Sequence, residues 1–254
     1  MTTPYRNDHL SASRGRVGNR YYLMTPDTMV DNTLPGLPAY SAVVLSAPQG
    51  SPARFGQYLL TLPAGTASTL PQGAGFENFL FVLEGKVAVA SPEEGIEWRL
   101  GGGDYLFLPE GHGFSLAATT AARMLWVKKR YAAVEGVESP TVVTGRLADV
   151  AGTEDESIDG SWAQLLPGDE RFDLAMNIMR FKGGARFRMV EIHHQEHGLY
   201  LLEGGGVYHL DGDHVDVQQG DFIYMAPYCT QAFTATGPGA SAYLLYKDVN
   251  RDGF

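Results

Sequence analysis

The sequence predicts an all-β protein made of two tandem β-barrels with few short helices. Its 254 residues include 31 glycines, 13 tyrosines and 12 phenylalanines, and only 19% of the residues are charged, which is typical of β-structure rich in turns. No convincing amphipathic helix precedes residue 145. An internal repeat decides the architecture, because the same strand and turn pattern occurs twice.

The repeat consists of two pairs of matching segments. Residues 77–85 match residues 196–204 at an offset of 119, and both segments begin with Glu and end in Leu-Glu-Gly. Residues 103–108 match residues 220–225 at an offset of 117, and both begin with Gly-Asp. Apolar strands bounded by glycine turns therefore recur in each half of the chain, and each half predicts one barrel.

The domain boundaries follow from this repeat and from changes in composition. We expect a polar N-terminal arm that packs on another element or subunit, and a connector between the barrels that ends in acidic residues. Within and beyond the connector, residues 147–150 predict a short helical turn and residues 164–167 an edge strand. The expected divisions are residues 1–20 for the arm, 21–131 for the first barrel, 132–162 for the connector and 163–254 for the second barrel.

Charge and composition exclude several classes of function. The chain has 19 Lys and Arg residues against 29 Asp and Glu residues, so its net charge of −10 argues against a nucleic-acid partner. No segment approaches 18 consecutive apolar residues, so no membrane span is expected. The first residues lack an apolar stretch, which argues against secretion and predicts a cytoplasmic protein. The sole cysteine, Cys229, excludes an intramolecular disulfide and a thiolate cluster, and we interpret it as a small buried filler.

Four residues of the second copy form a candidate metal site. Glu191 and His193 are two apart and project to the same face of an extended strand, whereas His197 joins them only if the chain turns. Gln231 follows the second apolar strand of this copy. Imidazole nitrogens with carboxylate and amide oxygens, and no sulfur, suit Mn(II), Fe(II), Ni(II) or Zn(II).

The first copy keeps the turns of the repeat but loses these ligands. The same template positions fall on Gln72, Ala74, Asn78 and Phe114. An alanine and a phenylalanine do not bind a cation, so we interpret the first barrel as structural.

A second set of candidate residues comes from the last strand. Tyr243, Leu245 and Lys247 share one face, and Tyr208 follows a glycine-rich turn. If that face looks into the barrel, a phenol and an ammonium group would meet a small anionic substrate such as a carboxylate. Periodicity alone leaves open the alternative, in which Lys247 is exposed on an edge strand.

The spacing of the four candidate ligands resembles the two motifs of the cupin superfamily, with the usual ligand types permuted. Residues 191–208, residues 220–227, Gln231 and residues 243–252 are similar to the (S)-ureidoglycine aminohydrolases, the bicupins of purine and allantoin breakdown. Similarity at residues 23–26, 129–131 and 134–136 extends the resemblance over nearly the whole chain.

The resemblance implies manganese-dependent release of ammonia from (S)-ureidoglycine, giving (S)-ureidoglycolate, by a homo-oligomer whose first barrel lacks metal ligands. The implied metal ligands are Glu191, His193, His197 and Gln231, and the implied substrate-binding residues are Tyr208, Tyr243 and Lys247. As our own hypothesis, Glu191 and Lys247 are the catalytic residues, Glu191 also moves a proton, and Gln231 contacts the substrate as well as the metal.

Two rival functions share these features. An Fe(II) dioxygenase or isomerase acting on a small carboxylate would use the same ligands, because cupins host many chemistries. A binding or storage bicupin is the other rival, although the complete set of four ligands favours an enzyme. A transcriptional regulator is disfavoured because the sequence shows no helix-turn-helix pattern and no basic stripe.

Overall fold

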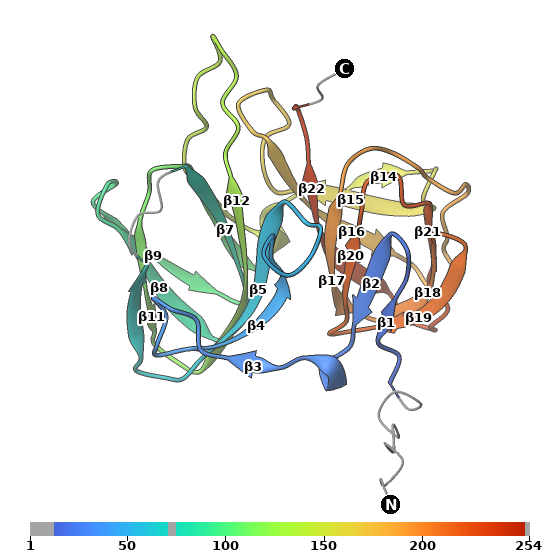
Figure 1. The fold of residues 1–254 in the computed structure, drawn as a ribbon, viewed down its shortest axis with the longest axis horizontal. Helices are drawn as coiled ribbons and strands as arrows, with labels where there is room; N and C mark the ends of the chain where they lie inside the picture. Colours follow the sequence, from blue (N-terminus) through green and yellow to red (C-terminus); the bar gives the residue numbers. More distant parts are fainter. Residues whose placement is uncertain (1–12, 71–74, 252–254) are drawn as a thin grey trace, which may run out of the picture. The chain divides into compact units, whose positions relative to one another are not determined.

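The computed structural model describes residues 13–70 and 75–251, and nearly all of its regular structure is β-strand (Figure 1). Two helical segments are described, and both are single 3-10 turns, Pro26–Thr28 (η1) and Leu147–Asp149 (η2). The second of these, η2, confirms the short helical turn expected at residues 147–150. Within the described residues, no helix is long and apolar enough to cross a membrane.

The chain divides into two compact units, each made of a large and a small antiparallel sheet. In the N-terminal barrel the seven-stranded sheet has the order β13-β10-β7-β12-β5-β4-β3, and the four-stranded sheet has the order β6-β11-β8-β9. Its strands are β3 (Asp31–Asn32), β4 (Ser41–Ser46), β5 (Phe55–Leu62), β6 (Ala67–Leu70), β7 (Phe76–Glu84), β8 (Lys86–Ser91), β9 (Ile96–Gly101), β10 (Asp104–Leu108), β11 (Phe114–Ala118), β12 (Ala122–Arg130) and β13 (Val143–Arg146).

In the C-terminal barrel the eight-stranded sheet has the order β1-β2-β20-β17-β22-β16-β15-β14, and the three-stranded sheet has the order β19-β18-β21. Its strands are β1 (Arg16–Val17), β2 (Tyr21–Met24), β14 (Thr153–Asp155), β15 (Gly160–Gln164), β16 (Leu174–Phe181), β17 (His197–Glu203), β18 (Gly205–Leu210), β19 (Asp213–Gln218), β20 (Phe222–Met225), β21 (Gln231–Thr234) and β22 (Ser241–Asp248).

Strand alternation explains how both sheets of the C-terminal barrel share one core. Along β18, Tyr208 and Leu210 are buried, while Val207 and His209, which alternate with them, are more exposed. Tyr208 and Leu210 form one apolar cluster with side chains of the large sheet such as Leu199. Because every second residue enters this cluster, the face that lines the barrel interior is fixed along each strand.

The glycine turns of the repeat are placed by backbone geometry. Gly204 has a φ of 66°, and a Cβ there would lie 2.3 Å from the Ala240 oxygen. Its counterpart in the first barrel, Gly85, has a φ of 83° and meets the Ala121 oxygen at 2.2 Å. Only glycine fits such a turn, so the repeat seen in the sequence is also a repeat of structure.

The first domain boundary differs from the expected one. Tyr21–Met24 was expected to open the first barrel, but this strand, β2, pairs with β20 of the C-terminal barrel, with Tyr21 opposite Met225. The compact unit that contains the N-terminal barrel begins at Val30. The expected boundary at residue 21 is therefore wrong, because an apolar pattern identifies a strand without identifying the strand beside it.

The connector expected at residues 132–162 contains strands of both barrels. Val143–Arg146 (β13) pairs with β10, with Arg146 opposite Asp104. Thr153–Asp155 (β14) and Gly160–Gln164 (β15) extend the large sheet of the C-terminal barrel. An edge strand was expected at residues 164–167, but the strand found here, β15, ends at Gln164. Residues 164–175 belong to the compact unit of the N-terminal barrel. Short strands with few apolar residues, such as these, carry too little pattern to be recognised.

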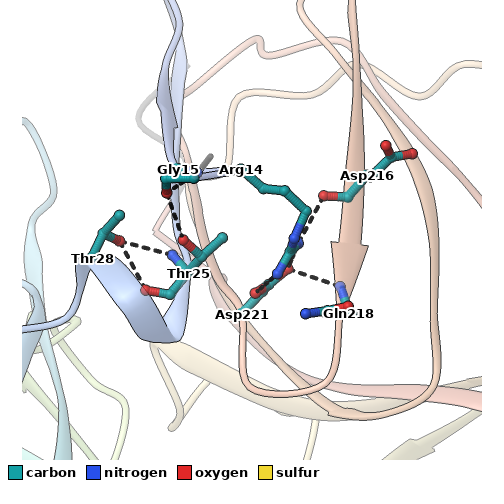
Figure 2. Close-up of polar contacts among 8 residues, drawn as sticks. Arg14, Gly15, Thr25, Thr28, Asp216, Gln218 and Asp221 are labelled. Atoms are coloured by element: carbon teal, nitrogen blue, oxygen red, sulfur yellow. Dashed lines mark hydrogen bonds and ion pairs between the residues drawn. The ribbon is translucent and has the colours of Figure 1, made fainter. Parts of the chain in front are cut away.

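The described part of the N-terminal arm packs on the C-terminal barrel of its own chain, with Arg14 as its anchor (Figure 2). The Arg14 guanidinium spans both oxygens of Asp221, with a distance of 2.9 Å from Nη2 to Oδ1. It also donates to the Asp216 carbonyl oxygen at 3.0 Å. The Asp221 side chain is fully buried, so Arg14 neutralises a carboxylate that has no access to water.

We expect Arg14→Ala to lower the free energy of unfolding by about 1.5–3 kcal/mol, the range for losing hydrogen bonds to a buried charge. Urea denaturation followed by circular dichroism measures this. Arg16→Ala is the matched control, because the Arg16 pair with Asp213 at 2.9 Å is largely exposed. That control should cost no more than about 1 kcal/mol. Equal effects of the two substitutions would contradict the role assigned to Arg14.

Candidate active site

A pocket of about 210 Å³ lies inside the C-terminal barrel and contains every candidate site residue from the sequence. Strands β14, β15, β16, β17, β18, β21 and β22 contribute to it, together with the segment between β16 and β17. The lining residues are Asp155, Ile158, Trp162, Asn177, Met179, Phe187, Glu191, His193, His197, Tyr208, Gln231, Tyr243, Leu245 and Lys247.

His197 is held rigidly at the start of β17, between β20 and β22. Its side chain is 2% exposed, and its Nδ1 lies 3.3 Å from the Tyr246 carbonyl oxygen. A carbonyl oxygen only accepts hydrogen bonds, so Nδ1 carries the proton and donates it. The Nε2 lone pair is thereby left facing the pocket, as in histidines that bind metals.

His193 and Gln231 meet His197 from two other segments. Glu191 and Gln231 form an isolated β-bridge, with backbone N···O distances of 2.8 and 2.9 Å. The chain then turns between His193 and His197, as the sequence requires. The two Nε2 atoms of His193 and His197 lie 3.1 Å apart, and the Gln231 amide nitrogen lies 2.9 and 3.1 Å from them.

Burial keeps both imidazoles neutral. Desolvation, with a smaller contribution from the Lys247 charge, lowers the pKa of His193 to about 4. Desolvation, followed by His193 and Lys247, lowers the pKa of His197 well below its ordinary value. Both rings are therefore unprotonated at neutral pH, which is the form that binds a metal ion.

This triad fits a divalent cation. Rotating the Gln231 amide by half a turn places its oxygen where the nitrogen lies, and three lone pairs then converge on one point. Their mutual distances of 2.9–3.1 Å match the ~3 Å that separates neighbouring ligands on an octahedral ion with bonds of about 2.1 Å. The donors are nitrogen and oxygen atoms, as expected for the metals considered above.

Glu191 lines the same pocket without joining the triad. Across residues 13–70 and 75–251, no three His, Cys, Asp or Glu side chains lie close enough to hold one metal ion. Desolvation raises the pKa of Glu191, and the Lys247 charge partly opposes this. Its expected place as a fourth ligand stays a prediction.

The last strand turns its expected face to the pocket. Tyr243, Leu245 and Lys247 all line it, and Lys247 lies opposite His197 in the β17–β22 register. The alternative of an edge-strand lysine is wrong, because β22 lies between β17 and β16. Tyr208 and Tyr243 are each 1% exposed, and burial raises the pKa of both phenols. Both side chains therefore remain hydrogen-bond donors at neutral pH.

The pocket also contains polar residues that sequence reasoning missed. Asn177 lies on β16, and its Oδ1 is buried without a hydrogen-bond partner among the described residues. Its signal was present in the sequence, because Asn177 and Met179 are two residues apart in an alternating run and therefore share one face of β16. Asp155 and Trp162 belong to the segment interpreted as a connector, where no pattern pointed to a site.

Cys229 lies outside the pocket. Its side chain is 3% exposed within the apolar core of the barrel, which confirms its interpretation as a filler. Burial raises the pKa of this thiol to about 12, so it is not a thiolate ligand at neutral pH.

Comparisons with known proteins agree with this architecture. A cupin domain model matches residues 177–246, and an EutQ-like cupin domain model matches residues 52–131. The (S)-ureidoglycine aminohydrolase of Escherichia coli (strain K12) is 37% identical, over 98% of this chain and 96% of the relative. The chain belongs to the (S)-ureidoglycine aminohydrolase family. An (S)-ureidoglycine aminohydrolase of Arabidopsis thaliana is 32% identical, over 91% of this chain and 76% of that relative.

A solved structure has the same fold over nearly the whole chain. The crystal structure of protein Ylba from E. coli superimposes with a TM-score of 0.83 at 33% sequence identity, and the match covers 98% of this chain and 99% of that one. The expected bicupin fold is confirmed, with one cupin domain in each half of the chain.

We expect His193→Ala to raise the dissociation constant for Mn²⁺ by more than the ~10–100-fold that typically follows loss of a residue supporting a ligand. Elemental analysis and a Mn²⁺ titration of the purified protein measure this. The control is His214→Ala, because the His214 side chain is exposed and lies outside the pocket. Its ring packs beside the ring of His209, at a centroid distance of 4.9 Å. Comparable Mn²⁺ affinity in both variants would rule out the triad as the metal centre.

Proposed function

We propose that this chain hydrolyses (S)-ureidoglycine to (S)-ureidoglycolate and ammonia, using one divalent cation. The observation that carries the proposal is the convergence of His193, His197 and Gln231 beside Lys247 in one pocket. The sequence adds support, because the chain is 37% identical to a relative that is named for this activity. A place in purine and allantoin breakdown, a homo-oligomeric assembly and a cytoplasmic location are further parts of the proposal.

His193, His197 and Gln231 would hold the cation, with Glu191 as the proposed fourth ligand. Mn²⁺ is our first choice among the metals that this donor set suits, ahead of Fe²⁺, Ni²⁺ and Zn²⁺. When bound, such an ion supplies a Lewis acid that neutralises developing negative charge and lowers the pKa of water.

Lys247 would recognise the carboxylate of the substrate. Its charge acts on Glu191, His193 and His197, so the ammonium group contributes a positive field where the candidate ligands meet. An anionic substrate gains from that field, because half-buried and buried side chains line the pocket and weaken screening by water. Its carboxylate would therefore orient the reacting carbon toward the histidines.

Glu191 would transfer protons between the substrate and water. Its raised pKa brings a buried carboxyl group closer to neutrality, where one group serves as both acid and base. As the bond from the central carbon to the amine breaks, its electron pair stays on nitrogen, and Glu191 supplies the proton that makes ammonia. The ureido nitrogen closes a C=N bond, and water adds to that carbon while giving a proton back to Glu191.

Tyr208, Tyr243 and Asn177 would bind the ureido group. The two phenols remain protonated and both line the pocket, so a hydroxyl hydrogen is available there to a carbonyl oxygen. Asn177 Oδ1 is a buried acceptor without a partner among the described residues, and a ureido N–H would satisfy it. The pocket therefore offers a donor and an acceptor to a group that carries both.

An assay of ammonia under strictly anaerobic conditions, with NMR of freshly generated ureidoglycine, tests the activity and the handedness of the product. We expect full activity and the (S)-product, because hydrolysis consumes no oxygen. Dependence on oxygen, or isomerisation without ammonia, would replace the proposal with the dioxygenase or isomerase alternative.

We expect Glu191→Gln to lower kcat by about 10²–10⁴, because an amide acts neither as an acid nor as a base near neutral pH. Metal content should be measured in parallel, so that loss of proton transfer is separated from loss of metal. Asp155→Asn is the matched control, since it removes another carboxylate of the pocket and keeps the oxygen that accepts from Ser157 at 2.8 Å. Ammonia release at the unsubstituted rate by the Glu191 variant would exclude the proton-transfer role.

We expect Asn177→Leu to lower kcat/KM by roughly 2–10-fold, the effect of losing one neutral hydrogen bond. The comparison is with Met179→Leu, on the same strand and in the same pocket, which changes shape without removing an acceptor. Steady-state kinetics on ureidoglycine measures both variants. If the two substitutions have the same effect, Asn177 contributes packing only.

A further inference from the structure

The compact unit of the N-terminal barrel, which includes residues 164–175 and 248–251, contains a cavity of about 630 Å³, larger than the pocket of the C-terminal barrel. Five of the chain's 19 Lys and Arg residues line it, in a protein whose net charge is −10. Aromatic rings accompany them, including Tyr58 and Phe76. The five cationic residues are Arg54, Lys128, Lys129, Arg130 and Arg251.

Three of these cations are already engaged. Lys129 pairs with Asp173, and Arg54 pairs with Asp248, which accounts for both carboxylates that line the cavity. Arg251 donates to backbone oxygens, including those of Ala132 and Glu170.

A buried glutamate near this cavity adds little negative charge. Glu77 is 0% exposed, and burial together with Asp173 raises its pKa well above the ordinary value. Its carboxyl group is therefore mainly neutral and does not balance the remaining cations.

Lys128 and Arg130 remain without a carboxylate. Both lie over the Phe76 ring, with the Lys128 nitrogen 4.3 Å and the Arg130 guanidinium carbon 4.6 Å from its centroid. Neither forms an ion pair among the described residues. Burial and the neighbouring Arg130 charge lower the pKa of Lys128, as expected where two positive charges are held together without a counter-ion.

The position of Lys128 repeats that of Lys247. In the β7–β12 register Lys128 lies opposite Asn78, and in the β17–β22 register Lys247 lies opposite His197. Both pairs are related by the repeat offset of 119 residues. The first barrel has thus lost the metal-ligand types and kept the lysine.

We propose that the cavity of the N-terminal barrel is a binding site for a small organic carboxylate. Lys128 and Arg130 bind its carboxylate group, and the rings of Tyr58 and Phe76 border its organic part. An anion there neutralises the two unpaired charges and accepts charge-assisted hydrogen bonds. The first barrel then has a binding role beyond the structural one expected from its missing ligands.

The test uses malonate as probe and the full chain with Lys247→Gln, which removes the matching lysine of the other pocket. Isothermal titration calorimetry should still detect one malonate per chain. Adding Lys128→Gln should weaken that binding at least roughly tenfold, as for a lost hydrogen bond to a charge. Lys86→Gln, at the exposed first residue of β8 in the same barrel, should leave it unchanged. Unaltered binding after Lys128→Gln would overturn the proposal.

A second measurement needs no substitution at Lys128. The chain has 3 tryptophans, and the Trp126 ring centroid lies 5.8 Å from the Lys128 nitrogen, whereas Trp162 lines the other pocket. In the Lys247→Gln protein, malonate should shift the indole N–H resonance of Trp126 and leave that of Trp162 in place. A shift of Trp162 alone would overturn the assignment of the site.

Two further probes fix the chemical class. Malonamide, the neutral analogue, should not bind, and inorganic sulfate should compete at least tenfold less well than malonate. Equal binding of malonamide would remove the role of the charges, and equal binding of sulfate would remove the preference for a carboxylate.

Discussion

The candidate active site depends on a backbone bridge between Gln231, at the start of β21, and Glu191, which lies outside the strands. Glu191 and Gln231 exchange two backbone hydrogen bonds, of 2.8 and 2.9 Å, at an isolated bridge outside the regular sheet on the Glu191 side. A further bond of 2.8 Å from the Tyr228 N–H to the His193 oxygen fixes the next residues. Without these bonds, His193 would have no defined direction relative to His197.

Burial then converts this geometry into chemistry. The same desolvation lowers the pKa of the two histidines and raises that of Glu191 and both tyrosines. Each group therefore sits closer to its neutral form than it would in water, while Lys247 supplies positive charge nearby. A pocket of this kind offers lone pairs, phenol donors and a cation side by side, which suits a small polar anion.

The fold could be predicted from the sequence because the repeat and the glycine turns are local features. Gly85 and Gly204 occupy the same position in the two copies of the repeat, and the structure shows the close backbone approaches that require glycine there. The face of β22 that carries Tyr243 and Lys247 followed from alternation alone once the barrel was assumed.

Partners that are distant in the chain were beyond such reasoning. Nothing local in Tyr21–Met24 indicates pairing with β20, and nothing local in Asp155 or Trp162 indicates a pocket shared with the candidate ligands at residues 191–231. Whether Glu191 joins the two histidines also depends on a side-chain direction that spacing does not set. Residues such as Asn177 were missed for a different reason, since an amide on an apolar strand was not weighed as an acceptor.

The large sheet of the C-terminal barrel is discontinuous along the chain, and this has a consequence for how the protein forms during synthesis. Strand β2 leaves the ribosome about 200 residues before its partner β20, beside which it lies in the folded sheet (Figure 1). The intervening N-terminal barrel is complete in sequence well before that moment, so it is able to fold while the leading strand waits. Closure of the sheet is thus a late, long-range event, and a chain interrupted before β20 leaves the edge of β2 open to pairing with other molecules.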